Sequence, residues 1–341
     1  MTSRIVINSP GLCTTVQDVG RISHQNLGVP PSGAMDRLAM AAANALVGND
    51  PRAAVLEFCY TGPGFEVEDG PVRVAVVGGD AALRLADGTL IPGNRSAVLA
   101  AGEKVTVLAP QSATYGVLAV SGGIEVAEVL ASRSTFLRGA FGGLDGRPLA
   151  AGDAFEVASA DTGLPDLELA AELPYGQGPI RVVLGPQADY FDDENIERFL
   201  SEQYRITRES DRMGMRLAGE PLRHARGYDI ATDGVVNGSV QVPGNGMPVI
   251  LLSDRQTVGG YPKIATVISS DLPRLGMLKP GEAISFEAVG IEEAVAIRRA
   301  QVRRLEELCQ SLRPVRRAGA IDVSTLLGEN LISGVAIWDE P

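Results

Sequence analysis

Short apolar runs, most of them bounded by glycine, proline or aspartate, dominate the chain and predict a mainly β protein. Runs of four or five apolar or β-branched residues suit a strand and are too short for a typical helix. The clearest runs span residues 73–77, 81–85, 105–108, 116–120, 181–184 and 249–252. We therefore expect many short strands and few helices.

A short motif of glycine, an acidic residue and an alternating strand occurs three times. Its copies read AAGEKVTV (100–107), AAGDAFEV (150–157) and KPGEAISF (279–286). Glycine supplies the turn, and the alternation gives each strand one buried face. Two copies lie in the first half of the chain and one in the second, which favours two related β-barrels. Three short matches are also compatible with ordinary turn chemistry.

Helical periodicity appears in only three places. Residues 36–47 begin with an acid and end before a glycine, and residues 192–204 open on acids that suit a helix N-terminus. Residues 291–312 form the longest candidate, with proline soon after. The side expected to be buried there carries Ile291, Val295, Val302, Leu305 and Leu308.

These elements divide the chain into three expected parts. Residues 1–175 form an N-terminal barrel subdomain, residues 176–290 a second barrel subdomain, and residues 291–341 a C-terminal helix and an apolar tail. The junction near residues 159–177 is rich in alanine, aspartate, glycine and proline, as linkers often are. The apolar tail is expected to pack on this chain or on a partner.

The charge balance argues against nucleic-acid and membrane-surface partners. The 341 residues include 30 lysines and arginines against 42 aspartates and glutamates, a net charge of −12. Such a field repels phosphate and anionic lipid. No apolar leader opens the sequence, and no apolar run approaches the roughly 18 residues of a spanning helix. We expect neither a nucleic-acid partner nor a membrane.

Cysteine and histidine usage narrows the chemistry further. The three cysteines lie far apart and form no C-x-x-C pair, which favours a reducing, cytoplasmic compartment. His24 and His224 are isolated from cysteines and paired acids, so no metal site is expected. A Walker-type phosphate loop, G-x-S-x-G and H-E-x-x-H are all absent from the sequence.

The densest polar chemistry is the stretch DRQTVGGYPKIATV, residues 254–267, between two apolar runs. A hairpin needs only about two to five connecting residues, so the surplus polar groups ask for a reason. The amides of Gly259 and Gly260 can face an anion, and Lys263 adds a positive charge. Asp254 and Gln256 can bind a planar amide through donor and acceptor edges. The alternative is a Gly-Gly hairpin whose polar residues face water.

Two further clusters precede this stretch. SDRMGMRL (210–217) carries Asp211, Arg212 and Arg216, and a surface turn with an Arg–Asp pair would also explain it. TDGVVNGSVQVPGNG (232–246) is glycine-rich and carries Gln241 shortly before the strand that leads to Asp254.

Taken together, these segments resemble the KipA-like family. That family includes the C subunit of bacterial 5-oxoprolinase, proteins labelled allophanate hydrolase subunit two, and half of the carboxyltransferase domain of urea carboxylase. The resemblance covers nearly the whole chain, in the expected order. It runs through TTVQDVGR (14–21), GVPPSGAMD (28–36), ANALVGN (43–49), SRST (132–135), GGLDGRPL (142–149), SDRMGMRL, DRQTVGGYPKIATV and GENLISGV (328–335).

The resemblance implies two cyclophilin-like β-barrel subdomains and an obligate KipI-like partner, the B subunit, with the active site near their shared face. The first function it implies is the C subunit of an ATP-dependent 5-oxoprolinase, which together with the A and B subunits opens 5-oxoproline, a small lactam, to glutamate. The second is a biotin-dependent carboxyltransferase or allophanate hydrolase-type subunit. The third is a regulator without chemistry of its own that binds a KipI-like kinase inhibitor.

The expected site gathers the polar clusters. A Gly-Gly turn with Lys263, and with Arg255 or Arg212 nearby, would stabilise negative charge developing on a substrate oxygen. We therefore expect catalytic roles for three residues, Lys263, Asp254 and Arg255. The residues expected to bind substrate are Gln241, Gln256, Thr257, Gly259, Gly260, Tyr261 and Arg212.

Overall fold

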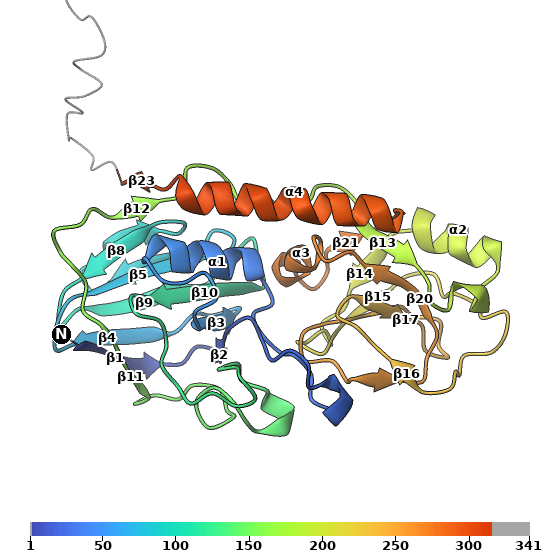
Figure 1. Ribbon diagram of the computed structural model, residues 1–341, viewed down its shortest axis with the longest axis horizontal. Helices are drawn as coiled ribbons and strands as arrows, with labels where there is room; N and C mark the ends of the chain where they lie inside the picture. Colours follow the sequence, from blue (N-terminus) through green and yellow to red (C-terminus); the bar gives the residue numbers. More distant parts are fainter. Residues whose placement is uncertain (1, 316–341) are drawn as a thin grey trace, which may run out of the picture.

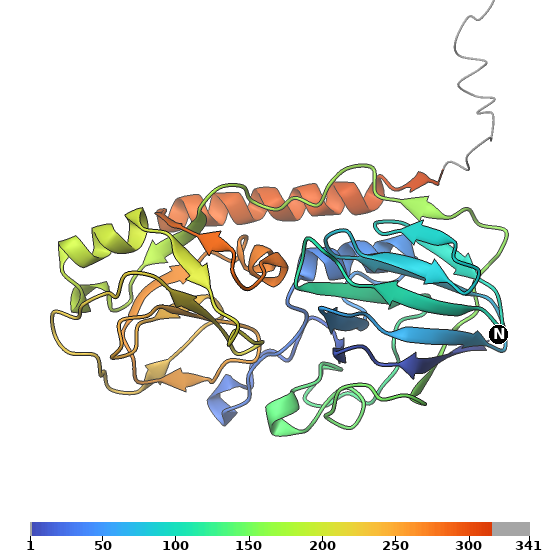
Figure 2. The same cartoon turned by 180° about the vertical axis from the view of Figure 1, so that it is seen from behind.

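The computed structural model describes residues 2–315 and confirms the mainly β fold (Figure 1). The apolar tail expected at the C-terminus, with its GENLISGV segment, lies outside the described residues. Two β units lie side by side, and one long helix runs across the same edge of both (Figures 1 and 2). None of the helices in the described part is long and apolar enough to cross a membrane.

The first unit consists of two antiparallel sheets with an apolar core between them. One sheet has the order β11-β1-β4-β9-β6-β7 and the other β2-β3-β10-β5-β8. The strands of the six-stranded sheet are β1 (Thr2–Ser9), β4 (Gly64–Glu68), β6 (Ala82–Leu85), β7 (Leu90–Pro92), β9 (Lys104–Leu108) and β11 (Ala154–Ala158). Those of the five-stranded sheet are β2 (Cys13–Gln17), β3 (Val55–Cys59), β5 (Val72–Val77), β8 (Ser96–Leu99) and β10 (Tyr115–Val120).

The second unit is an eight-stranded sheet in the order β21-β14-β15-β18-β17-β20-β13-β22. Its two edge strands, β21 (Ala283–Ile284) and β22 (Phe286–Ala288), are separated in sequence only by Ser285. The two edges must therefore lie close together, which curls the sheet into a nearly closed barrel. The inner strands are β13 (Ile180–Leu184), β14 (Tyr204–Ile206), β15 (Gly214–Ala218), β17 (Ser239–Gln241), β18 (Val249–Leu251) and β20 (Lys263–Val267).

Two short ladders and three 3₁₀ turns complete the strand structure. The small ladders pair β16 (Asp233–Gly234) with β19 (Val258–Gly259), and β12 (Leu167–Glu168) with β23 (Arg313–Pro314). The second of these pairs joins the linker between the units to the segment after the last helix. The 3₁₀ turns are η1 (Gln25–Leu27), η2 (Leu137–Gly139) and η3 (Ala188–Tyr190).

All three copies of the glycine-acid motif form the same turn. Gly102, Gly152 and Gly281 have φ of 86°, 93° and 93°, a region that disfavours residues with a Cβ. In each copy the acid accepts the backbone amide three residues before it, as Asp153 does from Ala150 at 2.7 Å. Glycine is thus required by backbone conformation, and the acid closes the turn before the strand.

The described region contains four α-helices, and each of the three expected helices is present. They are α1 (Arg37–Leu46), α2 (Asp193–Ser201), the short α3 (Leu272–Met277) and α4 (Ile291–Gln310). The second expected helix is too long at its C-terminus, because Tyr204 begins β14 instead. Its ring is fully buried beside Phe199 and Phe286, so barrel packing takes it out of the helix.

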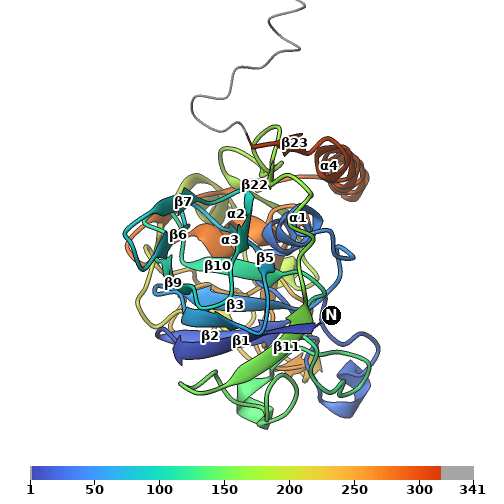
Figure 3. The ribbon, with the colours of Figure 1, turned by 90° about the vertical axis from the view of Figure 1, so that its left-hand side faces the viewer.

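The expected buried side of α4 is only partly right. Leu308 is buried, but Ile291 and Val295 are 70% and 43% exposed. The helix lies on the outside of both units, seen nearly end-on in Figure 3, and touches them along a narrow stripe. Gln301 is buried there, and its Nε2 donates to Pro174 O at 3.1 Å and Ser270 O at 2.8 Å. A polar residue, missed by the apolar periodicity, therefore fixes the helix.

Asp36 caps α1 from a buried position. Its Oδ1 accepts the amides of Leu38 and Ala39, each at 3.0 Å, and its Oδ2 accepts the hydroxyl of Tyr175 from the linker. Burial outweighs these bonds and raises the pKa of Asp36 to about 6. Between about pH 4 and pH 6 the folded protein thus keeps a proton that the unfolded chain has lost. Stability falls through this window as pH rises.

Replacing Asp36 by asparagine should remove this pH dependence while keeping a capping oxygen. Raising an aspartate pKa from about 3.9 to about 6 corresponds to about 3 kcal/mol of stability lost by pH 7. Urea unfolding at pH 4 and pH 7 measures it. The difference between the two pH values should be smaller by about that amount in Asp36→Asn. Parallel behaviour of the variant and the parent protein would contradict the assignment.

Candidate functional site

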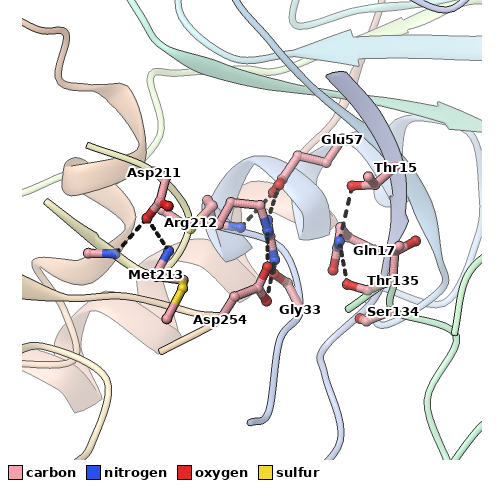
Figure 4. A network of polar contacts seen from close by, with 12 residues as sticks. Thr15, Gln17, Gly33, Glu57, Ser134, Thr135, Asp211, Arg212, Met213 and Asp254 are labelled. Atoms are coloured by element: carbon pink, nitrogen blue, oxygen red, sulfur yellow. Dashed lines mark hydrogen bonds and ion pairs between the residues drawn. The ribbon is translucent and has the colours of Figure 1, made fainter. Parts of the chain in front are cut away.

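Arg212 is the centre of an ionic network that joins the two β units (Figure 4). Its Nε donates to Asp254 Oδ2 at 2.8 Å and its Nη2 to Asp254 Oδ1 at 3.2 Å. Its Nη1 binds Glu57 of β3 in the first unit, and its Nη2 also reaches Gly33 O at 2.8 Å. Glu57 in turn accepts the amide of Met35 at 2.6 Å. The guanidinium therefore holds loops from both units in one geometry.

The network is buried, and its members depend on one another. Glu57, Asp254 and Arg212 are 2%, 5% and 8% exposed. Burial raises the pKa of Glu57, and the charge of Arg212 opposes that rise. Burial also pulls the pKa of Arg212 down, but the charges of Asp254 and Glu57 more than compensate and leave it raised. Of the 210–217 segment, Arg212 is therefore interior and pairs with Asp254, whereas Asp211 and Arg216 are exposed, as the surface-turn alternative expects for those two residues.

A cavity of about 320 Å³ lies against this network, between the two units. Arg212, Asp254 and Glu57 form part of its wall, and the methionines Met35 and Met213 contribute apolar surface. Further polar groups face it from β2, β3, β10 and η2: Cys13, Thr15, Cys59, Tyr60, Tyr115 and Arg138. Mixed apolar and polar walls of this size suit a small organic ligand with a few fixed polar groups.

The two cysteines of the cavity are cross-strand neighbours, since Cys13 of β2 pairs with Cys59 of β3. Hydrogen bonding with the Cys59 thiol lowers the pKa of Cys13 to about 7, against the opposing effect of burial. Cys13 is therefore partly exposed at the cavity, and its neighbouring thiol favours the ionised form. Adjacency of the two thiols across a sheet was not foreseen from their separation in the sequence.

A smaller recess of about 250 Å³ contains several of the expected binding residues. Gln241, Gln256 and Tyr261 line it, and it shares Arg138 and Asp211 with the cavity between the units. Gln256 Nε2 donates to Gln241 Oε1 at 3.2 Å. The structure thus brings Asp254 and Arg212 to one end of a polar groove and three other expected residues to its continuation.

The Gly-Gly segment has a different structure from the expected turn. Gly259 belongs to β19 and pairs with Asp233, while Gly260 O accepts the amide of Ile230 at 2.9 Å. Neither glycine adopts a positive φ. A Cβ on Gly259 would meet Gln241 Nε2 at 2.3 Å, so close packing of a glutamine explains this glycine. Thr257 O likewise accepts a backbone amide, that of Val235, at 3.1 Å.

Lys263 does not lie in the loop but begins strand β20. Its side chain is 2% exposed, and its Nζ donates to Asp233 Oδ2 at 2.8 Å and Gly234 O at 3.3 Å. It lines neither the cavity nor the recess. The geometry therefore gives Lys263 the task of holding β16 against the barrel: its Nζ bonds Asp233, the residue opposite Gly259, but Gly259 belongs to a strand and the two glycines form no anion cradle.

Arg255 also departs from the expected constellation. Asp254 and Arg255 are neighbours in the chain but line different pockets. Asp254 lines the cavity between the units, and Arg255 lines a separate pocket beside α1 and α4. The three residues expected to be catalytic therefore lie at three separate sites: Asp254 in the cavity, Arg255 in the pocket beside α4, and Lys263 in its ion pair with Asp233.

Glu57 and Arg138 are cavity residues that were not among the expected site residues. Glu57 stands within the apolar strand VLEFC, and a carboxylate inside such a run is a usable sign of a buried ion pair. Arg138 follows the SRST segment in η2 and makes no ion pair within residues 2–315. Only the folded chain places Arg138 in the walls of both the cavity between the units and the smaller recess.

A sequence model of the carboxyltransferase domain, subdomain A and B, matches residues 27–288. The chain belongs to this family. The match covers both β units, including Glu57, Arg138, Arg212 and Asp254 of the cavity wall. The family expectation drawn from the motifs is therefore confirmed.

Within this carboxyltransferase family, two bacterial relatives match the chain nearly end to end. It is 36% identical over 303 residues to the C subunit of 5-oxoprolinase from Escherichia coli, covering 89% of this chain and 96% of the relative. It is 34% identical over 298 residues to the C subunit of 5-oxoprolinase from Haemophilus influenzae, covering 86% and 94% of the two chains.

The fold also matches part of a much longer solved structure of the same family. The Kluyveromyces lactis urea amidolyase superimposes with a TM-score of 0.81 at 30% identity. The superposition covers 89% of this chain but only 20% of that enzyme. The similarity therefore concerns one region of a multidomain protein.

Proposed function

We propose that this chain is the C subunit of an ATP-dependent 5-oxoprolinase that opens 5-oxoproline to glutamate. The observation that carries the proposal is the extent of the match. The chain aligns with 96% and 94% of the length of two relatives named as C subunits of 5-oxoprolinase. It spans only a fifth of the urea amidolyase structure, which brings further domains on the same polypeptide.

The proposal includes partner subunits. The relatives are named as one subunit of several, and we assign a KipI-like B subunit to the face that carries the cavity between the units. The A subunit would complete the enzyme. Arg138 and Asp211 are exposed at that face. A partner seated there would cover the groove and exclude water from it.

The cavity suits a small lactam that carries one carboxylate. Its volume of about 320 Å³ is at the low end for ligand pockets, and its methionine and leucine side chains fit a five-membered ring. Arg138, which has no acidic partner within residues 2–315, would receive the carboxylate. The amide side chains of Gln241 and Gln256 in the adjoining recess would bind the lactam group.

The cavity between the units does not fit a nucleoside triphosphate. The cavity wall includes the carboxylates of Glu57, Asp211 and Asp254, which repel phosphate. The sequence also lacks a glycine-rich phosphate loop of the Walker kind. We therefore assign ATP binding to the other subunits of the complex.

The test is ATP-dependent release of glutamate from 5-oxoproline by the co-expressed A, B and C subunits. Omission of this chain should abolish release, and its return should restore it. Full activity of the other subunits without this chain would refute the proposal.

A biotin-dependent carboxyltransferase is the second candidate, favoured by the urea amidolyase superposition. It predicts that turnover needs a biotinylated carrier and is blocked by avidin, with urea as acceptor. A 5-oxoprolinase is unaffected by avidin, so the two candidates separate in one assay.

Replacing Arg138 by alanine should raise the KM for 5-oxoproline about ten- to a hundred-fold, the loss of one charge-assisted carboxylate contact. Its exposed position should leave folding unchanged. The matched control is Arg84→Ala, an exposed arginine of β6 that lines neither hollow. Steady-state kinetics of the reconstituted enzyme measure both. An unchanged KM for Arg138→Ala would show that the carboxylate binds elsewhere.

A further inference from the structure

Three arginines from distant parts of the sequence meet in a pocket of about 220 Å³ beside α4. They are Arg37 at the start of α1, Arg255 after β18, and Arg298 in α4. We call this group the arginine pocket. It lies away from the cavity between the units, although Met35 contributes to both walls.

The three guanidinium groups are close enough to repel one another. Burial and then the charge of Arg37 lower the pKa of Arg255 to about 10. Loss of contact with solvent lowers the pKa of Arg37, and the positive charge of Arg298 lowers it further. Bringing three like charges together costs free energy even in a protein whose net charge is −12, so a compensating anion is expected.

No carboxylate within residues 2–315 pairs directly with these three arginines. None of the three arginines forms an ion pair there, and no acidic residue lines the pocket. The charge of Asp18 offsets that of Arg37 only in part, and Asp18 forms no ion pair with it, since its Oδ1 accepts the Ser132 and Ser134 hydroxyls at 2.7 and 2.5 Å. Arg298 donates only to the neutral amide of Gln301, at 3.0 Å.

The pocket wall also contains buried polar atoms without a partner. Arg255 is 3% exposed, and its Nη1 has no acceptor among the described residues. Ser32 is 1% exposed, and its hydroxyl is equally unpaired within residues 2–315. The side-chain oxygen of Asn237 is also unpaired in this wall, but as an acceptor it needs a donor and does not contribute to binding an anion. Unpaired buried polar groups are rare because each costs about 1–3 kcal/mol.

We propose that the arginine pocket binds a small multivalent oxyanion of the phosphate type. Phosphate offers several oxygens with two negative charges, which match three guanidinium groups and a hydroxyl donor. The volume of about 220 Å³ lies below the roughly 300–1,000 Å³ of pockets for larger organic ligands. The first-turn amides of α1 take no part, because Asp36 already occupies them.

Isothermal titration of inorganic phosphate into the full-length chain tests the site, with chloride as the background salt at constant ionic strength. One phosphate should bind per chain. Arg298→Gln should weaken binding about ten- to a hundred-fold, as expected for one lost charge-assisted contact. The matched control is Arg299→Gln, the next residue of α4, which is exposed and outside the pocket. It should leave the affinity unchanged.

A second arginine variant and a second anion test whether binding depends on the arginine pocket and on phosphate. Arg37→Gln should reproduce the loss seen for Arg298→Gln, and malonate should bind more weakly than phosphate. No detectable phosphate binding, an equal loss in Arg298→Gln and Arg299→Gln, or tighter binding of malonate would each overturn the proposal. The titration uses this chain without its partners, so its outcome is independent of the proposed 5-oxoprolinase activity.

Discussion

Replacing Arg212 by glutamine is expected to lower the free energy of unfolding by about 3–5 kcal/mol, the usual cost of breaking a buried ion pair from one side. The substitution leaves Glu57 and Asp254 buried, with their mutual repulsion unopposed. Native proteins retain only about 5–15 kcal/mol in total, so the loss is a large fraction of the stability. It should also loosen the junction of the two units, since Arg212 bonds to residues of both.

Urea unfolding followed by circular dichroism measures the effect. The matched control is Arg216→Gln, four residues later, on the exposed side of β15. That change should cost less than about 1 kcal/mol, as for most surface substitutions. Equal losses in the two variants would mean that the network does not stabilise the fold.

Replacing Asp254 by asparagine is expected to lower kcat of the reconstituted 5-oxoprolinase about a hundred-fold. Both carboxylate oxygens of Asp254 orient Arg212 in the cavity wall, and an amide cannot accept both bonds. A small misplacement of a cavity group is enough for a loss of that size. Asp254 acts here as a positioning residue, so kcat should fall more than KM rises, and the complex with the partner subunits should still form.

Lys263→Met is the informative comparison. Lys263 is as buried as Asp254 but lines neither hollow, so we expect lower stability near β16 with kcat reduced only a few-fold. A severe loss of turnover in a folded Lys263→Met enzyme would restore the catalytic role that the sequence pattern favours. Full turnover in Asp254→Asn would show that the Asp254–Arg212 pair in the cavity wall does not contribute to catalysis.

Local patterns in the sequence were sufficient to predict six of the strands, three helices and the recurring turn. Gly102, Gly152 and Gly281 adopt the same conformation because a glycine followed by an acid carries all the information that the turn needs. Asp36 likewise caps α1 through contacts within three residues. Interactions of such short range can be predicted from the few neighbouring residues in the sequence that form them.

The site depends on contacts of long range, which local patterns do not encode. Glu57 and Arg212 are separated by 155 residues and meet only when the two units pack together. Crowded polar chemistry at residues 254–263 marked an unusual segment, but Asp254 and Arg255 lie in the turn after β18, where the folded backbone sets the direction of each side chain. Asp254 and Arg255 consequently face different hollows, and Lys263 turns to Asp233.

The path of α4 across both β units has a consequence for biosynthesis. Domains tend to fold in order as the chain leaves the ribosome, and both β units precede α4 in the sequence. Arg298 and Gln301 emerge after every other residue named in the arginine pocket and in the Gln301 contacts. The nascent chain can thus complete each β unit first, and the two units are joined to a common helix only after both have been synthesised.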